Sequence, residues 1–101
     1  MKSAKIPLDE EKRLQILKSF NVLDSLAEEE YDSITKIAAQ ICNTPIALVS
    51  LVDSNRQWFK SKYGLSANET SRDYAFCAHS ILEPDRLFIV PDATKDPRFK
   101  D

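Results

Sequence analysis

The segment Ile46-Ala47-Leu48-Val49-Ser50-Leu51-Val52 decides how this chain folds. It is almost entirely aliphatic, and Pro45 and Asp53 bound it. An apolar run of this length is typical of a β-strand with both faces buried. Such a strand also needs a hydrogen-bonded neighbour on each side, because its backbone groups are shielded from water. We therefore expect an interior strand of a sheet, covered by helices.

The residues that follow predict a hairpin partner for this strand. Asp53-Ser54-Asn55 is turn-forming, and a second strand is predicted from 56 to 63, where Gly64 ends it. Alternation puts Arg56, Trp58, Lys60 and Lys62 on one face of this strand and Gln57, Phe59, Ser61 and Tyr63 on the other. Both faces carry aromatic residues, so the pattern leaves the inward face undecided.

Three helices are predicted around the hairpin. The first spans 9–20 and begins at Asp9, a favourable N-cap residue. The second spans 26–42 and follows a capping box in which Ser25 is the N-cap and Glu28 the N3 glutamate. A short third helix spans 73–82, with Ser71 or Asp73 as its cap. The second helix has an apolar face suited to cover the buried strand, formed by Tyr31, Ile34, Ile37, Ala38 and Ile41.

The remaining segments are predicted as connections and one further strand. Residues 65–72 are polar and predict a loop, 87–90 predict a short strand stopped by Pro91, and 92–101 are rich in turn formers. We expect one domain over 1–101, with a helical lead over 1–24 and the helix, hairpin, short helix and strand over 25–101.

Composition narrows the class of protein. The chain has 101 residues and a formal net charge of −2 with its charges scattered, which favours a single domain and argues against nucleic-acid binding. No apolar run is long enough to cross a membrane and no signal peptide opens the chain, so we expect a cytoplasmic protein with Cys42 and Cys77 as thiols. A single glycine excludes phosphate-binding loops and dinucleotide fingerprints, which need several.

Candidate chemistry is sparse. Cys77 and His79 could form a nucleophile and base pair, but residues two apart on a helix point in different directions. Adding Cys42 gives no spacing typical of a zinc site. Acidic residues that could pair for acid–base catalysis fall in loops and at helix starts, where capping explains them: Glu69, Asp73, Asp92 and Asp96.

Aromatic residues offer two interpretations. They belong either to the core or to a ligand pocket between the strands and the short helix, a usual position for a binding site in such a fold. The residues concerned are Trp58, Phe59, Tyr74, Phe76 and Phe88.

Several blocks of the sequence occur in a familiar order. They are 46–53, 56–61 (Arg-Gln-Trp-Phe-Lys-Ser), 69–73, 76–81 (Phe-Cys-Ala-His-Ser-Ile) and 90–99 (Val-Pro-Asp-Ala-Thr-Lys-Asp-Pro-Arg-Phe). From about residue 12 onward, the chain resembles bacterial GAF domains, which occur at the N-terminus of sensor histidine kinases of two-component systems and of GGDEF diguanylate cyclases.

The resemblance implies an α+β fold. This is a GAF-like (profilin/PAS-like) antiparallel sheet with helices on one face and a pocket on the other, roofed by about 65–85. Domains of this family continue past the last block into further strands and a closing helix, so the sheet is expected to be incomplete and the chain to be the N-terminal two-thirds of a truncated domain. We expect a homodimer or a strand-swapped oligomer to cover the open edge. The alternative is a small monomer with a frayed edge.

The resemblance also implies a sensor that binds a small molecule or a partner and biases an output domain. We expect this chain to be no enzyme, although a full-length protein could carry a kinase or cyclase output domain. The expected ligand-binding residues are Trp58, Phe59, Phe76, Cys77, His79 and Asp92, with no catalytic residue, no metal, no nucleic acid and no membrane insertion. The alternatives are a dimerisation module without a small ligand and a thiol enzyme similar to the methionine sulfoxide reductases of this fold.

No cofactor is assigned by the resemblance. Relatives that bind tetrapyrroles carry a Cys-His dipeptide in a later helix, whereas Cys77 and His79 are separated by Ala78. Cyclic-nucleotide binding in the family uses residues beyond position 101.

Overall fold

An open, three-stranded antiparallel sheet in the order β1-β2-β3 forms the centre of the chain. The computed structural model describes residues 1–100. Along the chain lie α1 (Glu10–Ser19), α2 (Glu29–Cys42), β1 (Ala47–Val52), β2 (Arg56–Tyr63), β3 (Glu69–Ser71), the 3₁₀ turn η1 (Arg72–Tyr74) and α3 (Phe76–Ser80). The α+β class and the open antiparallel sheet agree with the sequence prediction.

The β1–β2 hairpin forms as predicted, with one irregularity. Val49 pairs with Ser61 and Ser50 pairs with Phe59, so Lys60 is an extra residue on β2 and forms a β-bulge. The turn is closed by the amide of Asp53, which donates to the carbonyl of Arg56 at 2.8 Å. The bulge breaks the alternation that the sequence predicted along β2.

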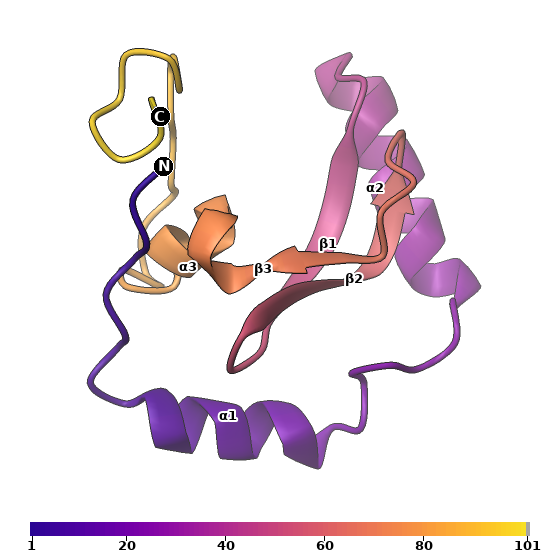
Figure 1. Cartoon of the computed structure of the whole chain (residues 1–101). Coiled ribbons are helices and arrows are strands. Elements are labelled where there is room, and N and C mark those ends of the chain that lie inside the picture. The colour runs from indigo at the N-terminus through magenta and orange to yellow at the C-terminus, as the bar shows by residue number, and fades with distance from the viewer. Residues whose placement is uncertain (101) are drawn as a thin grey trace.

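Helix α2 packs beside the β1–β2 hairpin (Figure 1), but through only part of the predicted face, since Tyr31 and Ala38 are half-buried and the isoleucines are exposed. Thr35 and Ala39 are its buried residues, and the Thr35 hydroxyl lies 2.9 Å from the hydroxyl of Ser61 on β2. The predicted isoleucines remain more than half exposed: Ile34 at 56%, Ile37 at 52% and Ile41 at 78%. The prediction was wrong about the isoleucines because a polar pair of small residues allows the helix to approach the sheet closely.

The start of α2 also differs from the prediction. The helix begins at Glu29, with Glu28 rather than Ser25 in the N-cap position. The Ser25 hydroxyl donates to the carbonyl of Val22 and accepts from the ammonium of Lys60. It is therefore engaged with the sheet and cannot cap the helix.

Strand β1 lies at an edge of the described sheet, since it pairs with β2 alone. Only Val52 in this strand is buried and the other five residues are half-buried. Within residues 1–100, β1 thus lacks the second neighbour expected of an interior strand, which agrees with the expectation of an incomplete sheet with an open edge. The predicted strand over 87–90 does not form, and Leu87 and Ile89 of this segment are 86% and 65% exposed.

The segment predicted as a loop and one helix forms three short elements instead. Glu69–Ser71 adds β3 to the sheet by pairing with 56–58 of β2. Ser71 then caps η1 by accepting from the amide of Asp73 at 3.3 Å, as predicted for a cap at this position. Ala75, which is buried and has an extended backbone, separates η1 from α3.

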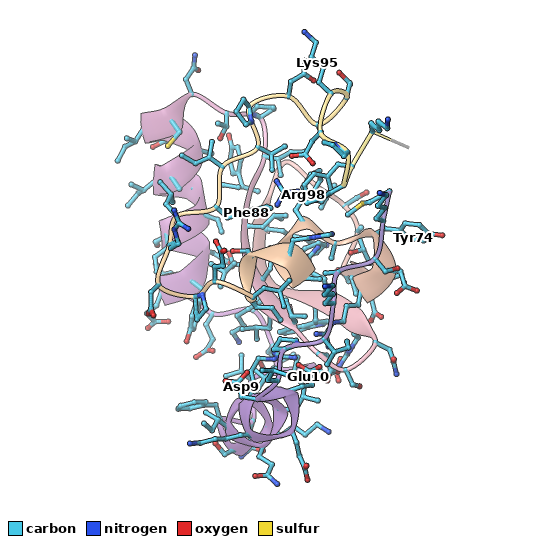
Figure 2. The ribbon with its side chains drawn as sticks, turned by 90° about the vertical axis from the view of Figure 1, so that its left-hand side faces the viewer. Asp9, Glu10, Tyr74, Phe88, Lys95 and Arg98 are labelled. Atoms are coloured by element: carbon cyan, nitrogen blue, oxygen red, sulfur yellow. The ribbon has the colours of Figure 1, made fainter. Side chains whose placement is uncertain are left out.

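Two arginines attach α1 to the hairpin. Arg72, 6% exposed, pairs with Glu10 and donates to the carbonyls of Asp53 and Ser54 at 3.1 and 3.3 Å. Arg13 donates to the carbonyl of Val52 at 2.6 Å. Glu10 lies on the side of α1 that faces the rest of the chain (Figure 2). Hydrogen bonding to Arg72 lowers the pKa of Glu10 below its ordinary value.

The two ends of the chain lie side by side (Figure 1), where the amide of Lys2 donates to the carbonyl of Arg98 at 2.8 Å. Phe99 is buried there, with its ring 4.3 Å from that of Phe76 and 4.8 Å from that of His79. Figure 2 shows Arg98 beside Phe88 in this cluster. Within residues 1–100 we find no helix with the length and apolar character needed to cross a membrane.

Candidate functional site

A polar cavity of about 520 Å³ lies between β2, the start of α2 and the segment that leads into β3. We call it the strand cavity. It is lined by Asp24, Ser25, Ala27, Asp32, Trp58, Phe59, Lys60, Ser61, Lys62, Asn68 and Glu69. Its size lies in the range of about 300–1,000 Å³ typical of small-molecule sites.

Lys60 is the central buried charge of this cavity. The bulge directs its side chain, which is 1% exposed, to the start of α2. There its ammonium donates to the Ser25 hydroxyl at 2.7 Å and the Leu26 carbonyl at 2.6 Å, and it pairs with Glu28 at 2.7 Å. All three protons of the ammonium therefore have a partner, as a buried cation requires.

Arg56 closes one side of the same region through three carboxylates. It binds Asp24 through two bonds of 2.8 and 2.9 Å, Asp53 at 3.0 Å and Glu69 at 3.1 Å. This network lowers the pKa of Asp24, chiefly through the hydrogen bond from Arg56, and raises the pKa of Arg56 itself. It joins the loop before α2, the hairpin turn and β3. Asp24 adopts a positive φ of 61°, which suits the short polar side chain at this bend.

An apolar groove of about 530 Å³ lies on the other side of the sheet, beside the open edge of β1. It is lined by Arg13, Ile16, Leu17, Phe20, Ser50, Leu51, Val52, Cys77, Ser80 and Ile81. The groove offers mainly apolar contact and one thiol, and Cys77 is half-buried within it.

The residues predicted to bind a ligand are distributed over different parts of the chain. Trp58 and Phe59 line the strand cavity, and Cys77 lines the apolar groove. Phe76 and His79 contact Phe99 in the cluster near the chain ends. Asp92 is exposed, and its carboxylate accepts from the amide and hydroxyl of Thr94. The structure thus brings two of the six together in one cavity.

Sequence reasoning missed the charged residues of the strand cavity. Lys60, Arg56 and Asp24 carry its ionic contacts, and none of the three was predicted to do so. A signal was present, since β2 contains both cationic and aromatic residues within a segment that must pack against a helix. Cations in such a strand require acidic partners from neighbouring segments.

No family model matches this chain. A curated relative is the cyclic di-GMP phosphodiesterase PA2567 of Pseudomonas aeruginosa, which is 41% identical over 95 residues. The match covers 94% of this chain and 16% of the relative, so the chain spans about one sixth of that protein's length.

This match corrects one expectation. The sequence had led us to expect a chain that is no enzyme, whereas the relative is named for the hydrolysis of a phosphodiester and is an enzyme. The expectation concerned the catalytic groups of these 101 residues, whereas the name describes a protein about six times longer.

Proposed function

We propose that this chain is a sensory region of the GAF type in an enzyme of cyclic di-GMP signalling. In this role it binds a small molecule or a partner and alters the activity of an output region. The similarity to a cyclic di-GMP phosphodiesterase over nearly the whole chain is the observation that carries the proposal. The GAF-type order of sequence blocks and the presence of a ligand-sized polar cavity add support.

The test is a measurement of cyclic di-GMP in the cell. An in-frame deletion of the codons for residues 10–100 is compared with a recoded allele that leaves the protein unchanged, and the nucleotide is quantified by mass spectrometry. We expect the deletion to change the cellular level at least twofold. An unchanged level across growth conditions would contradict the proposal.

A second candidate function is self-association, and two features on one side of the chain favour it. Asp32 hydrogen-bonds Ser61 on β2, and Ile34, Ile37 and Ile41 lie on roughly the opposite flank of α2. This isoleucine stripe therefore faces the side on which β1 leaves its backbone unpaired. A strand edge without charged residues, next to exposed apolar side chains, is a surface that soluble proteins usually cover.

We propose that a second copy of the chain covers this side, because β1 and the stripe are both uncharged and present no repulsion to an identical surface. Size-exclusion chromatography with light scattering tests this. A mass of two or more copies that rises with concentration is expected, and a monomer at every concentration would exclude it.

A further inference from the structure

The indole of Trp58 has a polar atom without a partner in the described part of the chain. Trp58 is 8% exposed, and none of the hydrogen bonds among residues 1–100 involves its N–H. The strand cavity is the described cavity that this side chain lines. The N–H is not among the buried side-chain atoms without a partner in residues 1–100, so it is open to solvent and available to a ligand in the cavity that supplies an acceptor.

The cations of the strand cavity already have hydrogen-bond partners. Lys60 is held by Glu28, Ser25 and the Leu26 carbonyl. The ammonium of Lys62 donates to the carbonyls of Ser66 and Ala67 and to the side chain of Asn68, at 2.6 to 3.2 Å. An anionic ligand would have to displace these contacts, so the cavity offers no ready site for a phosphate group.

The carboxylates, in contrast, keep oxygens available. Asp32 accepts from the Ser61 hydroxyl through Oδ1 at 2.6 Å, and no described residue donates to Oδ2. Glu69 accepts from Arg56 through Oε1 at 3.1 Å, and its Oε2 is likewise without a described donor. The groups that the cavity offers to a ligand for hydrogen bonding are thus two carboxylate oxygens and the indole N–H.

We propose that the strand cavity binds a small molecule that carries a guanidinium group together with a hydrogen-bond acceptor. The cation donates to Asp32 and Glu69, and the acceptor receives the N–H of Trp58. Charge-assisted bonds of this kind are stronger than neutral ones, and a guanidinium fits a carboxylate through two parallel bonds. The inference rests on the proposed sensory function and specifies the chemical class of its ligand. It also disfavours cyclic di-GMP as the occupant of this cavity, because its phosphodiesters are anionic.

Trp58 makes a direct test possible, because it is the single tryptophan of the chain. Its indole gives one resonance in a ¹H–¹⁵N correlation spectrum of the ¹⁵N-labelled protein. L-arginine is the probe, since it has a guanidinium and a carboxylate acceptor. L-citrulline, which has the same shape with a neutral urea in place of the guanidinium, is the matched control. We expect a saturable shift of the indole resonance with arginine and at least tenfold weaker binding of citrulline.

Variants localise the effect. Asp32→Asn should weaken arginine binding at least tenfold, whereas Asp85→Asn, at an exposed turn outside the cavity, should leave it unchanged. The backbone resonances of the same spectra report whether each variant is folded. No saturable shift with arginine, or equal binding of citrulline, would overturn the proposal, and so would an unaltered affinity of folded Asp32→Asn.

The same titration, repeated with nucleotides and neutral metabolites, separates this inference from the proposed function. A neutral or anionic compound that shifts the indole would overturn the cation assignment and leave a sensory role intact. If none of these compounds shifts the indole resonance and the cyclic di-GMP level in the deletion strain is unchanged, both this inference and the proposed function are overturned.

Discussion

The two edges of the sheet, β3 and β1, differ in how their polar and apolar groups are covered. On the β3 side, charged residues are paired: Lys60 with the start of α2, and Arg56 with carboxylates from three segments. On the β1 side, the backbone edge is unpaired and the isoleucines of α2 are exposed. One side is therefore built around a polar cavity and the other around apolar contact.

This difference indicates a division of roles. Buried ionic contacts fix geometry, since removing one partner leaves a charge or carbonyl without compensation. Exposed apolar side chains add little to the stability of the isolated chain but favour association. The following predictions test whether stability lies on the β3 side and association on the β1 side.

The largest effect is expected for Lys60→Ala. It removes a side chain that is 1% exposed and leaves the Leu26 carbonyl and the Ser25 hydroxyl without their donor. We expect the free energy of unfolding to fall by about 3 kcal/mol in urea denaturation. Lys62→Ala is the control, since its ammonium bonds a surface loop, and a loss of only about 0.5 kcal/mol is expected. Equal losses in the two variants would show that Lys60 contributes no more to the free energy of unfolding than Lys62 does.

The next effect concerns Gly64, where β2 ends beside the start of β1. Its φ is +79°, and a Cβ placed there would lie 1.9 Å from the carbonyl oxygen of Pro45. Gly64→Ala therefore combines backbone strain with a clash against main chain, and we expect a loss of about 2 kcal/mol or more in the same assay. Ser66→Ala, two residues on in the exposed loop, should change stability by less than about 0.5 kcal/mol. A Gly64→Ala protein as stable as wild type would contradict the close approach of these segments.

A smaller effect is expected at acid pH from Glu10. Hydrogen bonding to Arg72 lowers its folded pKa below the ordinary value of 4.5, so the pair contributes stability above that pH. This contribution is lost as the pH falls through the folded pKa. We expect Glu10→Gln to be about 1 kcal/mol less stable at pH 7, with the difference shrinking as the pH falls below 4.5. Melting temperatures measured from pH 7 to pH 2 provide the check.

Glu11→Gln is the matched control for that series, since Glu11 is exposed on the same helix. Its melting curve should follow that of the wild type at each pH. A parallel displacement of the Glu10→Gln curve at all pH values would show that packing rather than charge accounts for the loss.

Local patterns predicted most of the hairpin and the helices. The apolar run at 46–52 and the turn at 53–55 place β1 and β2 correctly, and α1 differs from its prediction by one residue at each end. Turn chemistry and periodicity act over a few residues, so the sequence reports them directly.

The predictions that were wrong depend on contacts between residues that lie far apart in the sequence. The sequence could not show that Lys60 forms a bulge and draws Ser25 away from its capping role, because the two residues are 35 positions apart. It also could not show that Thr35 and Ala39, rather than the isoleucines, contact the sheet. Hydrophobicity ranks the isoleucines first, whereas the approach distance set by small residues decides the contact. The six predicted binding residues were likewise predicted from residue type alone. Residue type does not report which residues meet in space, and the structure separates them.

The smallest effect on stability is expected on the apolar side. Ile37 is 52% exposed in the middle of the α2 stripe, so Ile37→Gln should change the free energy of unfolding of the monomer by less than about 0.5 kcal/mol. Its effect should appear instead in the concentration dependence of the mass, because the glutamine places a polar group in the proposed contact between copies. Lys36→Gln, next to it on the solvent face of the same helix, should leave the mass unchanged. If Ile37→Gln unfolds the monomer, the stripe is part of the core and the two sides of the sheet do not differ as described. If it changes neither mass nor stability, association does not use this flank, and the exposed isoleucines need another explanation.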